Sequence, residues 1–289
     1  MAKVAFLGLG VMGFPMAGHL VAKGHDVTVY NRTFAKAQQW TQKHKGKAAK
    51  TPREAAEGNE IVFCCVGNDD DLRSVVLGAD GGLAGMKAGT IFVDHTTASA
   101  KVARELYDAA RQQGIDFIDA PVSGGQAGAE NGVLTVMCGG DQAPFDNAKP
   151  VIDSFARACV LIGASGAGQL TKMVNQICIA GVVQGLSEAV NFGMKAGLDM
   201  EKVIGAISKG AAQSWQMENR WKTMVDDKFE FGFAVDWMRK DLGICLDESK
   251  TNGAQLPMTA LVDQFYARVQ ARGGRRWDTS SLIQLLAKP

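Results

Sequence analysis

Short apolar runs alternate with segments of helical periodicity over the first half of the chain. The apolar runs are rich in Val, Ile and Phe and nearly continuous, as buried strands are. They predict strands at Val4–Leu9, Asp26–Tyr30, Ile61–Val66, Ile91–Asp94, Phe117–Asp119, Leu134–Cys138 and Val160–Ile162. The segments between them predict helices at Met12–Lys23, Phe34–Lys45, Asp69–Leu77, Ser99–Gln113 and Asp141–Phe155. This alternation favours an α/β domain built on a mostly parallel, doubly wound sheet.

The pattern changes after residue 163. Gly163–Gly168 is a loop of small residues, and Leu170–Ala196 then reads as one long helix without proline. That helix is apolar on most sides, which is typical of a buried helix. From Met200 onward the segments are helical. We therefore expect an α/β domain at residues 1–163, an interdomain helix at 164–196 and an all-helical C-terminal domain at 197–289.

Composition narrows the class of protein. Hydrophobic residues make up 46% and charged residues 21% of the 289 residues, and the net charge is +1. These values are typical of a soluble globular protein. A net charge this close to zero gives no overall electrostatic attraction to nucleic acid or to an acidic membrane surface. Apolar runs are too short for a signal peptide or a membrane span. The six cysteines form no CxxC and the four histidines have no metal-ligand spacing. We expect reduced thiols, a cytoplasmic location and no metal site.

A glycine motif follows the first predicted strand. Residues Gly8-Leu9-Gly10-Val11-Met12-Gly13 match GxGxxG and open a predicted helix. Gly8 permits a tight turn, Gly10 lets the backbone approach a pyrophosphate, and Gly13 allows close packing of helix and strand. The helix N-terminus presents free N–H groups to the phosphates. A glycine turn without a ligand is the alternative, but the context predicts a Rossmann-type dinucleotide-binding domain.

The end of the second strand bears on which dinucleotide binds. An NAD site usually has an acid here for the ribose 2′-hydroxyl. The chain instead has Asn31-Arg32-Thr33. The planar guanidinium of Arg32 suits a 2′-phosphate, and Asn31 and Thr33 add polar groups. These residues predict NADP(H), unless Arg32 is only an exposed loop residue.

Two further segments carry candidate chemistry. Ser123-Gly124-Gly125 follows a strand and offers backbone N–H groups and a hydroxyl to a carboxylate, although glycine alone more often marks a structural turn. Lys172 lies near the start of the long helix, with Asn175 and Gln176 on the same face. Burial favours the neutral amine, so Lys172 suits proton transfer to and from a substrate oxygen. A lysine that extends its amine into solvent is an equal alternative.

Taken together, these segments resemble the β-hydroxyacid dehydrogenase family over the whole chain. The match covers the run from Phe6 to Ala17, the run from Asp119 to Gly132 and the run from Gly168 to Asn175. The resemblance implies that Ser123, Gly124 and Gly125 hold the substrate carboxylate and that Lys172 is the general acid and base. Asn175 would assist it, and Gln176 stands where the family often has a second asparagine.

The resemblance also assigns roles that spacing does not. Thr97, in Thr96-Thr97, is similar to a threonine near nicotinamide and substrate. Lys240-Asp241-Leu242 resembles a C-terminal motif whose lysine lies near the cofactor and whose aspartate supports the site, although alone it would more often be a surface ion pair. Phe233 falls where reductase members place an aromatic ring over the substrate. Val66 is a further expected cofactor contact. Family members are usually dimers or tetramers, so we expect a homodimer or homotetramer.

The expected activity is therefore NADP(H)-dependent interconversion of a small β-hydroxy acid with its semialdehyde or keto acid. Two alternatives share the scaffold. An imine reductase usually replaces the lysine, and Lys172 is present. A non-catalytic dinucleotide-binding protein would also tend to lose it. The substrate partner is a small carboxylate.

Overall fold

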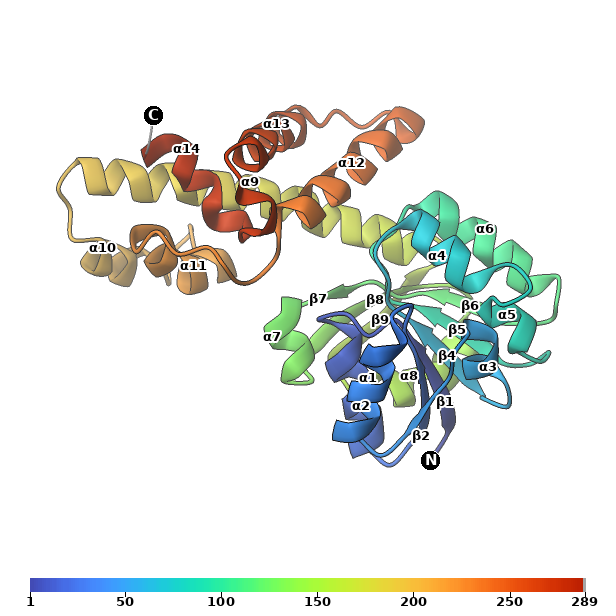
Figure 1. Ribbon diagram of the computed structural model, residues 1–289. Coiled ribbons are helices and arrows are strands. Elements are labelled where there is room, and N and C mark those ends of the chain that lie inside the picture. Colours follow the sequence, from blue (N-terminus) through green and yellow to red (C-terminus); the bar gives the residue numbers. More distant parts are fainter. Residues whose placement is uncertain (288–289) are drawn as a thin grey trace. The chain divides into compact units, whose positions relative to one another are not determined.

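The computed structural model describes residues 1–287 and consists of two compact units (Figure 1). The first unit comprises Met1–Lys172, and the second begins at Met173. The division falls within helix α9, Ala167–Lys195, which runs without a break from one unit into the other.

A nine-stranded sheet forms the centre of the first unit. Its order is β3-β2-β1-β4-β5-β6-β8-β7, with β9 paired to β8. Strands β1 to β6 are parallel, and β8 pairs antiparallel with β6 and β7 but parallel with β9. Because the strand order reverses at β1 and β4, the loop after β1 lies at the switch point, where open α/β sheets bind ligands. The strands are β1 Lys3–Leu7, β2 Asp26–Tyr30, β3 Lys47–Ala48, β4 Ile61–Cys64, β5 Ile91–Asp94, β6 Asp116–Asp119, β7 Val122–Ser123, β8 Leu134–Gly139 and β9 Ala156–Gly163.

Helices cover both faces of this sheet (Figure 1). Successive strand residues point to opposite faces, so Phe6 packs in one hydrophobic cluster and Leu7 in the other. The Phe6 face is covered by α1 Gly13–Ala22, α2 Phe34–Lys43, α7 Gly125–Glu130 and α8 Gln142–Ile152. The Leu7 face is covered by α3 Pro52–Ala56, α4 Asp69–Val76, α5 Gly82–Gly85 and α6 Ala100–Arg111. The predicted doubly wound, mostly parallel sheet is confirmed.

Most differences from the predicted elements concern very short elements. The structure adds β3, β7, α5 and α7, which have two to six residues and too few positions to show a period. Strand β9 begins at Ala156, four residues earlier than predicted. Its apolar residues Val160 and Ile162 are about half exposed, at 51% and 50%, because β9 lies at an edge of the sheet. Our expectation that this run is a buried strand was wrong.

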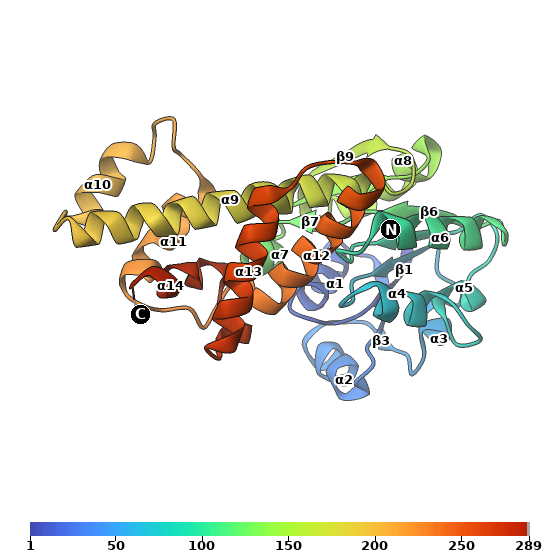
Figure 2. The same cartoon turned by 90° about the horizontal axis from the view of Figure 1, so that it is seen from above.

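The second unit is helical, as predicted. Its core joins Val183 and Leu186 of α9 to Met217, Leu242 and Tyr266 from three other helices. Helices α12 and α13 lie side by side (Figure 2). The helices after α9 are α10 Met200–Ile207, α11 Trp215–Val225, α12 Val235–Asn252, α13 Pro257–Ala271 and α14 Gln284–Ala287, with 3₁₀ turns at Gly274–Arg276 and Thr279–Ile283.

Helix α9 is less completely buried than its composition predicts. Val174 and Phe192 expose 62% and 73% of their surface on one side of the helix. Among the described residues, α9 is the one helix long and apolar enough to cross a membrane by those two criteria alone. Core helices of soluble proteins meet the same criteria, so a single such helix is weak evidence for a span.

Candidate active site

The glycine loop adopts a backbone that side chains would disrupt. Gly8 follows β1 with φ +97°, and its N–H donates to the Tyr30 carbonyl at 2.8 Å. A Cβ on Gly8 would collide with the Cys65 carbonyl, and one on Gly13 would collide with the Gly8 carbonyl. A Cβ on Gly10 would meet nothing within 4 Å, so the backbone there is open to a ligand. The loop therefore fits a dinucleotide pyrophosphate at the start of α1.

Asn31 and Arg32 follow β2 directly, beside this loop. The Asn31 carbonyl oxygen accepts from Leu9 N at 3.0 Å, and its amide donates to Thr33 O at 3.1 Å. Asn31 thus ties the glycine loop to the β2 end. The Arg32 side chain is 84% exposed and forms an ion pair of 2.9 Å with Asp71, in the first turn of α4.

Asp94 and Thr96 shape the loop after β5. The buried Asp94 carboxylate accepts from Thr96 N at 2.9 Å, and Thr96 Oγ1 accepts from Val66 N at 3.0 Å. Burial raises the pKa of Asp94 to about 7, although the hydrogen bonds from Thr96 oppose that shift. The loop that carries Thr97 is thereby joined to Val66, a predicted cofactor contact.

Asp119, at the end of β6, anchors the start of α9. Its two carboxylate oxygens accept from Gly166 N at 2.7 Å and from Gln169 N at 2.9 Å. Burial raises the pKa of Asp119 to about 6 against the opposing effect of these hydrogen bonds. Lys172, in the second turn of the helix that this carboxylate holds, is 8% exposed. Of the two readings that the sequence left open for this lysine, the structure has the buried side chain.

The Gln169 side chain reaches the Thr97 loop from α9. Its amide nitrogen donates to Thr96 O at 2.7 Å, and its carbonyl oxygen accepts from Ala98 N at 3.0 Å. Sequence analysis did not identify Gln169 or the anchoring role of Asp119. One signal was available for Gln169, because it precedes Lys172 by three residues and so shares its face of the helix.

The predicted carboxylate loop combines a strand and a short helix. Ser123 is in β7, paired with Thr135 of β8, and is half-buried. Gly124 and Gly125 have φ of +130° and +60° and lead into α7. The two glycines are exposed. The predicted loop is therefore a surface turn between β7 and α7.

The remaining predicted residues lie in the second unit. The Gln176 amide donates to the Asp241 carboxylate at 2.6 Å, and its carbonyl oxygen accepts from Asn175 at 2.8 Å. Lys240 forms an ion pair of 3.1 Å with Asp241. Asp241 is 2% exposed, so a surface ion pair, the reading that its sequence alone favours, is wrong. The structure brings these four residues together.

Phe233 is held by the C-terminal segment of the same unit. Its N–H donates to the Asp278 carboxylate at 2.9 Å, and its carbonyl accepts from Thr279 N at 3.0 Å. Asp278 is buried and forms an ion pair of 3.0 Å with Arg220.

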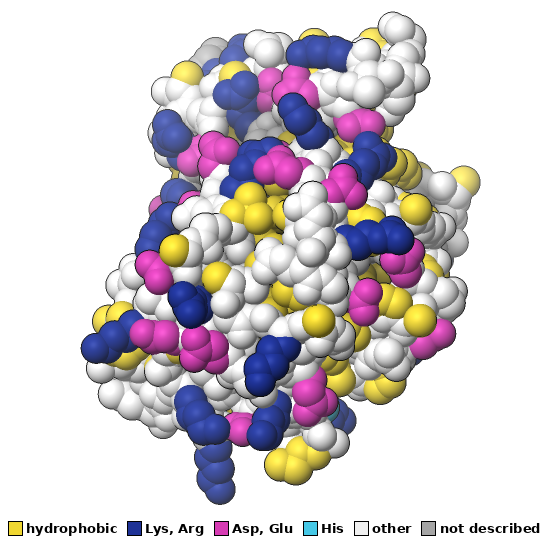
Figure 3. Space-filling model, turned by 90° about the vertical axis from the view of Figure 1, so that its right-hand side faces the viewer, with side chains coloured by type: hydrophobic (Ala, Val, Ile, Leu, Met, Phe, Trp, Pro, Cys, Tyr) yellow, Lys and Arg dark blue, Asp and Glu magenta, His cyan; other side chains and the backbone are white. Residues whose placement is uncertain are grey.

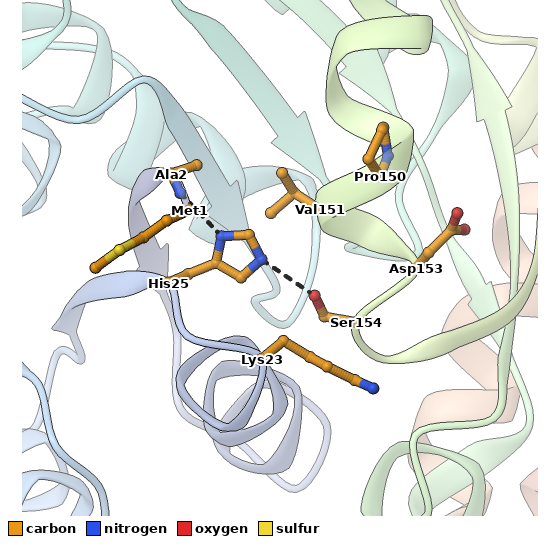
Figure 4. Close-up of a pocket in the computed structure, with 8 residues that line it drawn as sticks. All are labelled: Met1, Ala2, Lys23, His25, Pro150, Val151, Asp153 and Ser154. Carbon is orange, nitrogen blue, oxygen red and sulfur yellow. Dashed lines mark hydrogen bonds between the residues drawn. The ribbon is translucent and has the colours of Figure 1, made fainter.

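A cavity of about 500 Å³ lies away from all of these residues. It lies beside residues that precede β1 and β2, at the amino-terminal end of these strands, whereas the glycine loop lies at their carboxyl-terminal end. His25 Nε2 lies 3.4 Å from Ser154 Oγ within it (Figure 4). None of the predicted site residues is among those that line the cavity, which are Met1, Ala2, Lys23, His25, Pro150, Val151, Asp153 and Ser154.

Basic and acidic side chains are interspersed over the face in Figure 3, in keeping with the net charge of +1. Within residues 1–287, no group of three or more His, Cys, Asp or Glu is arranged to hold a metal ion.

Comparison with known proteins assigns the chain to a class. Residues 3–163 match the NAD binding domain of 6-phosphogluconate dehydrogenase, and residues 166–286 match the family described as NAD-binding of NADP-dependent 3-hydroxyisobutyrate dehydrogenase. The chain is 69% identical to an uncharacterized oxidoreductase of Shewanella frigidimarina (strain NCIMB 400), over 100% of this chain and 99% of that protein. It is 34% identical to 2-hydroxy-3-oxopropionate reductase of Escherichia coli (strain K12), over 99% and 97%.

A solved structure agrees with this assignment. The 3-hydroxyisobutyrate dehydrogenase of Mycobacterium tuberculosis, determined with L-serine, superposes with a TM-score of 0.89 at 31% identity and covers 99% of each chain. The glycine loop and the matched domains together define the class as an NAD(P)-dependent oxidoreductase. The chain belongs to the β-hydroxyacid dehydrogenase family, which confirms the resemblance found in its sequence.

Proposed function

We propose that this protein uses NADP(H) to interconvert a small β-hydroxy acid and its semialdehyde or keto acid, with Lys172 as general acid and base. The observation that carries the proposal is the set of buried hydrogen bonds that joins the start of α9 to the Thr97 loop in the first unit. Lys172 follows Gln169 by one turn of α9, and Gln169 bonds to the peptide groups on both sides of Thr97. The helix that carries the Lys172 amine is thereby joined to the loop that carries the Thr97 hydroxyl.

Three groups of residues would bind different parts of NADP(H). Gly8 to Gly13 would hold the pyrophosphate, and Asn31, Arg32 and Thr33 the phosphorylated ribose. Val66, Thr97 and Lys240 would contact the rest of the cofactor. When bound, NADP(H) supplies or accepts the hydride.

The chain's own residues handle the substrate and the proton. Ser123, Gly124 and Gly125 bind the substrate carboxylate, which fixes the position of the reacting carbon. In the reductive direction the Lys172 ammonium donates its proton to the carbonyl oxygen, and in the oxidative direction the neutral amine takes it back. Asn175, Gln176 and Asp241 orient the polar groups, and Phe233 covers the substrate. The L-serine in the mycobacterial relative is itself a small β-hydroxy acid, which supports this substrate class.

Replacement of the lysine tests the proton-transfer role. Lys172→Ala should lower kcat by about 10²- to 10⁴-fold, the usual effect of losing a general acid, while the Kd for NADPH stays within about twofold. Lys195→Ala, at the far end of the same helix, is the matched control and should keep full activity. Steady-state rates with glyoxylate and small semialdehydes measure both variants. Full activity in Lys172→Ala would reject the assignment.

Arg32 and Asp71 provide a separate test of NADP preference. A 2′-phosphate would compete with Asp71 for the guanidinium. Arg32→Ala should therefore weaken NADPH binding with little effect on NADH, whereas Asp71→Asn should strengthen NADPH binding. Fluorescence titration with both cofactors measures the ratio. A parent enzyme that prefers NADH would exclude the NADP(H) part of the proposal.

We also propose a cytoplasmic homodimer or homotetramer. Support for self-association comes from a stripe of exposed, mostly apolar residues on α9 at spacings of three and four, formed by Val174, Cys178, Val182, Gly185, Ala189 and Phe192. Exposed apolar stripes of this kind are typical of interfaces. Phe192→Glu should reduce the mass measured by light scattering, and a monomeric parent would refute self-association.

A further inference from the structure

The Gln169 side chain is enclosed and fully engaged. It has no exposed surface, and its single amide group makes two hydrogen bonds in opposite senses, to Thr96 O and from Ala98 N. The two peptide groups that it holds lie on either side of Thr97. An amide that donates and accepts in this way fixes the position of the segment along both bond directions.

The backbone of Gln169 is itself fixed. Its N–H donates to one oxygen of Asp119, and Gly166 N donates to the other. Asp119 is the last residue of β6, which pairs in register with β5 at Asp94. Since Asp94 in turn accepts from Thr96 N, the loop and the helix start are linked through the sheet as well as through Gln169.

We propose that Gln169 is a positioning residue that sets the Thr97 loop relative to the Lys172 amine through its paired hydrogen bonds to Thr96 and Ala98. This inference rests on the proposed function, because it concerns the geometry of the same proton transfer. The hydrogen bonds of the Gln169 side chain go to backbone groups, so Gln169 acts through Thr97 and the α9 helix.

Two variants separate the hydrogen bonds from the volume of the side chain. Gln169→Leu fills similar space but leaves Thr96 O and Ala98 N without their partner. Gln169→Glu keeps an acceptor for Ala98 N, and only its protonated form can also donate to Thr96 O. Titratable groups on the segments that Gln169 contacts include the carboxyls of Asp94 and Asp119 and the imidazole of His95, and Lys172 lies one turn further along α9.

The expected outcome has three parts. Gln169→Leu should lower kcat by about 10- to 100-fold, the range for a small misplacement of reacting groups, with NADPH Kd nearly unchanged. Gln169→Glu should regain activity relative to the parent as the pH falls from about 8 to about 6, because the neutral acid restores the missing donor. In the enzyme without cofactor, hydrogen exchange at Ala98 N should be faster in Gln169→Leu than in the parent.

A control variant lowers the stability of the same unit without changing the Thr97 loop. Ile152→Ala deletes buried volume in α8 of the same unit and should lower the melting temperature but leave kcat unchanged well below the transition. If Gln169→Leu behaves like Ile152→Ala, or if Gln169→Glu shows no recovery at low pH, the positioning role is overturned. Failure of the proposed function would look different, since the parent itself would not turn over hydroxy acids or semialdehydes with NADPH.

Discussion

Asp119 offers a sharp quantitative test of the electrostatics around the start of α9. Its pKa in the folded protein is about 6, against 3.8 for an ordinary aspartate, and burial is the main cause. Because the folded pKa is the higher one, the stability that this group contributes is present below pH 3.8 and is lost as the pH rises through 6. A difference of about 2 units corresponds to about 3 kcal/mol of unfolding free energy.

Asp119→Asn removes this titration while it keeps the shape of the side chain. The amide is neutral at every pH, as the protonated acid is, but it has one acceptor oxygen for the two N–H groups of Gly166 and Gln169. The lost hydrogen bond adds a cost that does not change with pH, so the test is how the difference between variant and parent varies with pH. Between about pH 4 and about pH 8 the difference in unfolding free energy should shift by about 3 kcal/mol in favour of the variant. Asp94 titrates in both proteins and largely cancels, although its own pKa falls slightly when the Asp119 charge is gone.

Urea unfolding followed by circular dichroism at several pH values measures this shift. A constant difference between the two proteins would show that the folded pKa of Asp119 is ordinary. A shift of the opposite sign would show that the backbone hydrogen bonds to the carboxylate outweigh the cost of its burial. Either result would refute the reasoning.

Three shorter predictions follow from other contacts. Gly13→Ala should weaken NADPH binding at least about tenfold in a fluorescence titration, because the new Cβ collides with the Gly8 carbonyl of the cofactor loop. His95→Phe should reduce the loss of stability in acid, because burial lowers the pKa of His95 to about 4. The contribution of the neutral imidazole to the unfolding free energy, about 3 kcal/mol, is present above pH 6.5 and is lost as the pH falls through 4. Urea unfolding with the same pH dependence in variant and parent would contradict this. Asp278→Ala should cost about 3 to 5 kcal/mol by leaving Arg220 without its buried partner, and thermal unfolding with little change would show that the pair is dispensable.

Much of the fold could be predicted because the central strands are buried on both faces. Runs such as Ile61–Cys64 and Ile91–Asp94 are continuous and apolar, so the sequence marks them clearly. At the edge of the sheet that signal fails, since β9 alternates mainly between half-buried and exposed residues and only its most apolar part was predicted. The exposed side of α9 was missed for a related reason: composition does not reveal whether an apolar helix face is covered within the chain.

From the sequence, candidate site residues could be named only where the residue type itself suggests a chemistry, as the glycines after β1 and the amine of Lys172 do. Gln169 and Asp119 act through hydrogen bonds to backbone groups about 50 to 70 residues away in the chain, and nothing local in the sequence indicates those partners. Arg32 is an intermediate case, because its exposure was considered but its ion pair with Asp71 was not.

The two buried carboxyls at the ends of β5 and β6 explain why the candidate site lowers the stability of the folded protein and is nevertheless well ordered. Asp94 and Asp119 are paired in register, both have raised pKa values, and each accepts N–H groups from the segment that follows or packs on its strand. Apolar residues at these positions would avoid the burial of charge, but they would leave the N–H groups of Thr96, Gly166 and Gln169 without acceptors. The carboxyls therefore fix the Thr97 loop and the first turn of α9 at the expense of stability near neutral pH. Local instability that coincides with fixed geometry is typical of a functional site, and here it lies at the first turn of α9, one turn before Lys172.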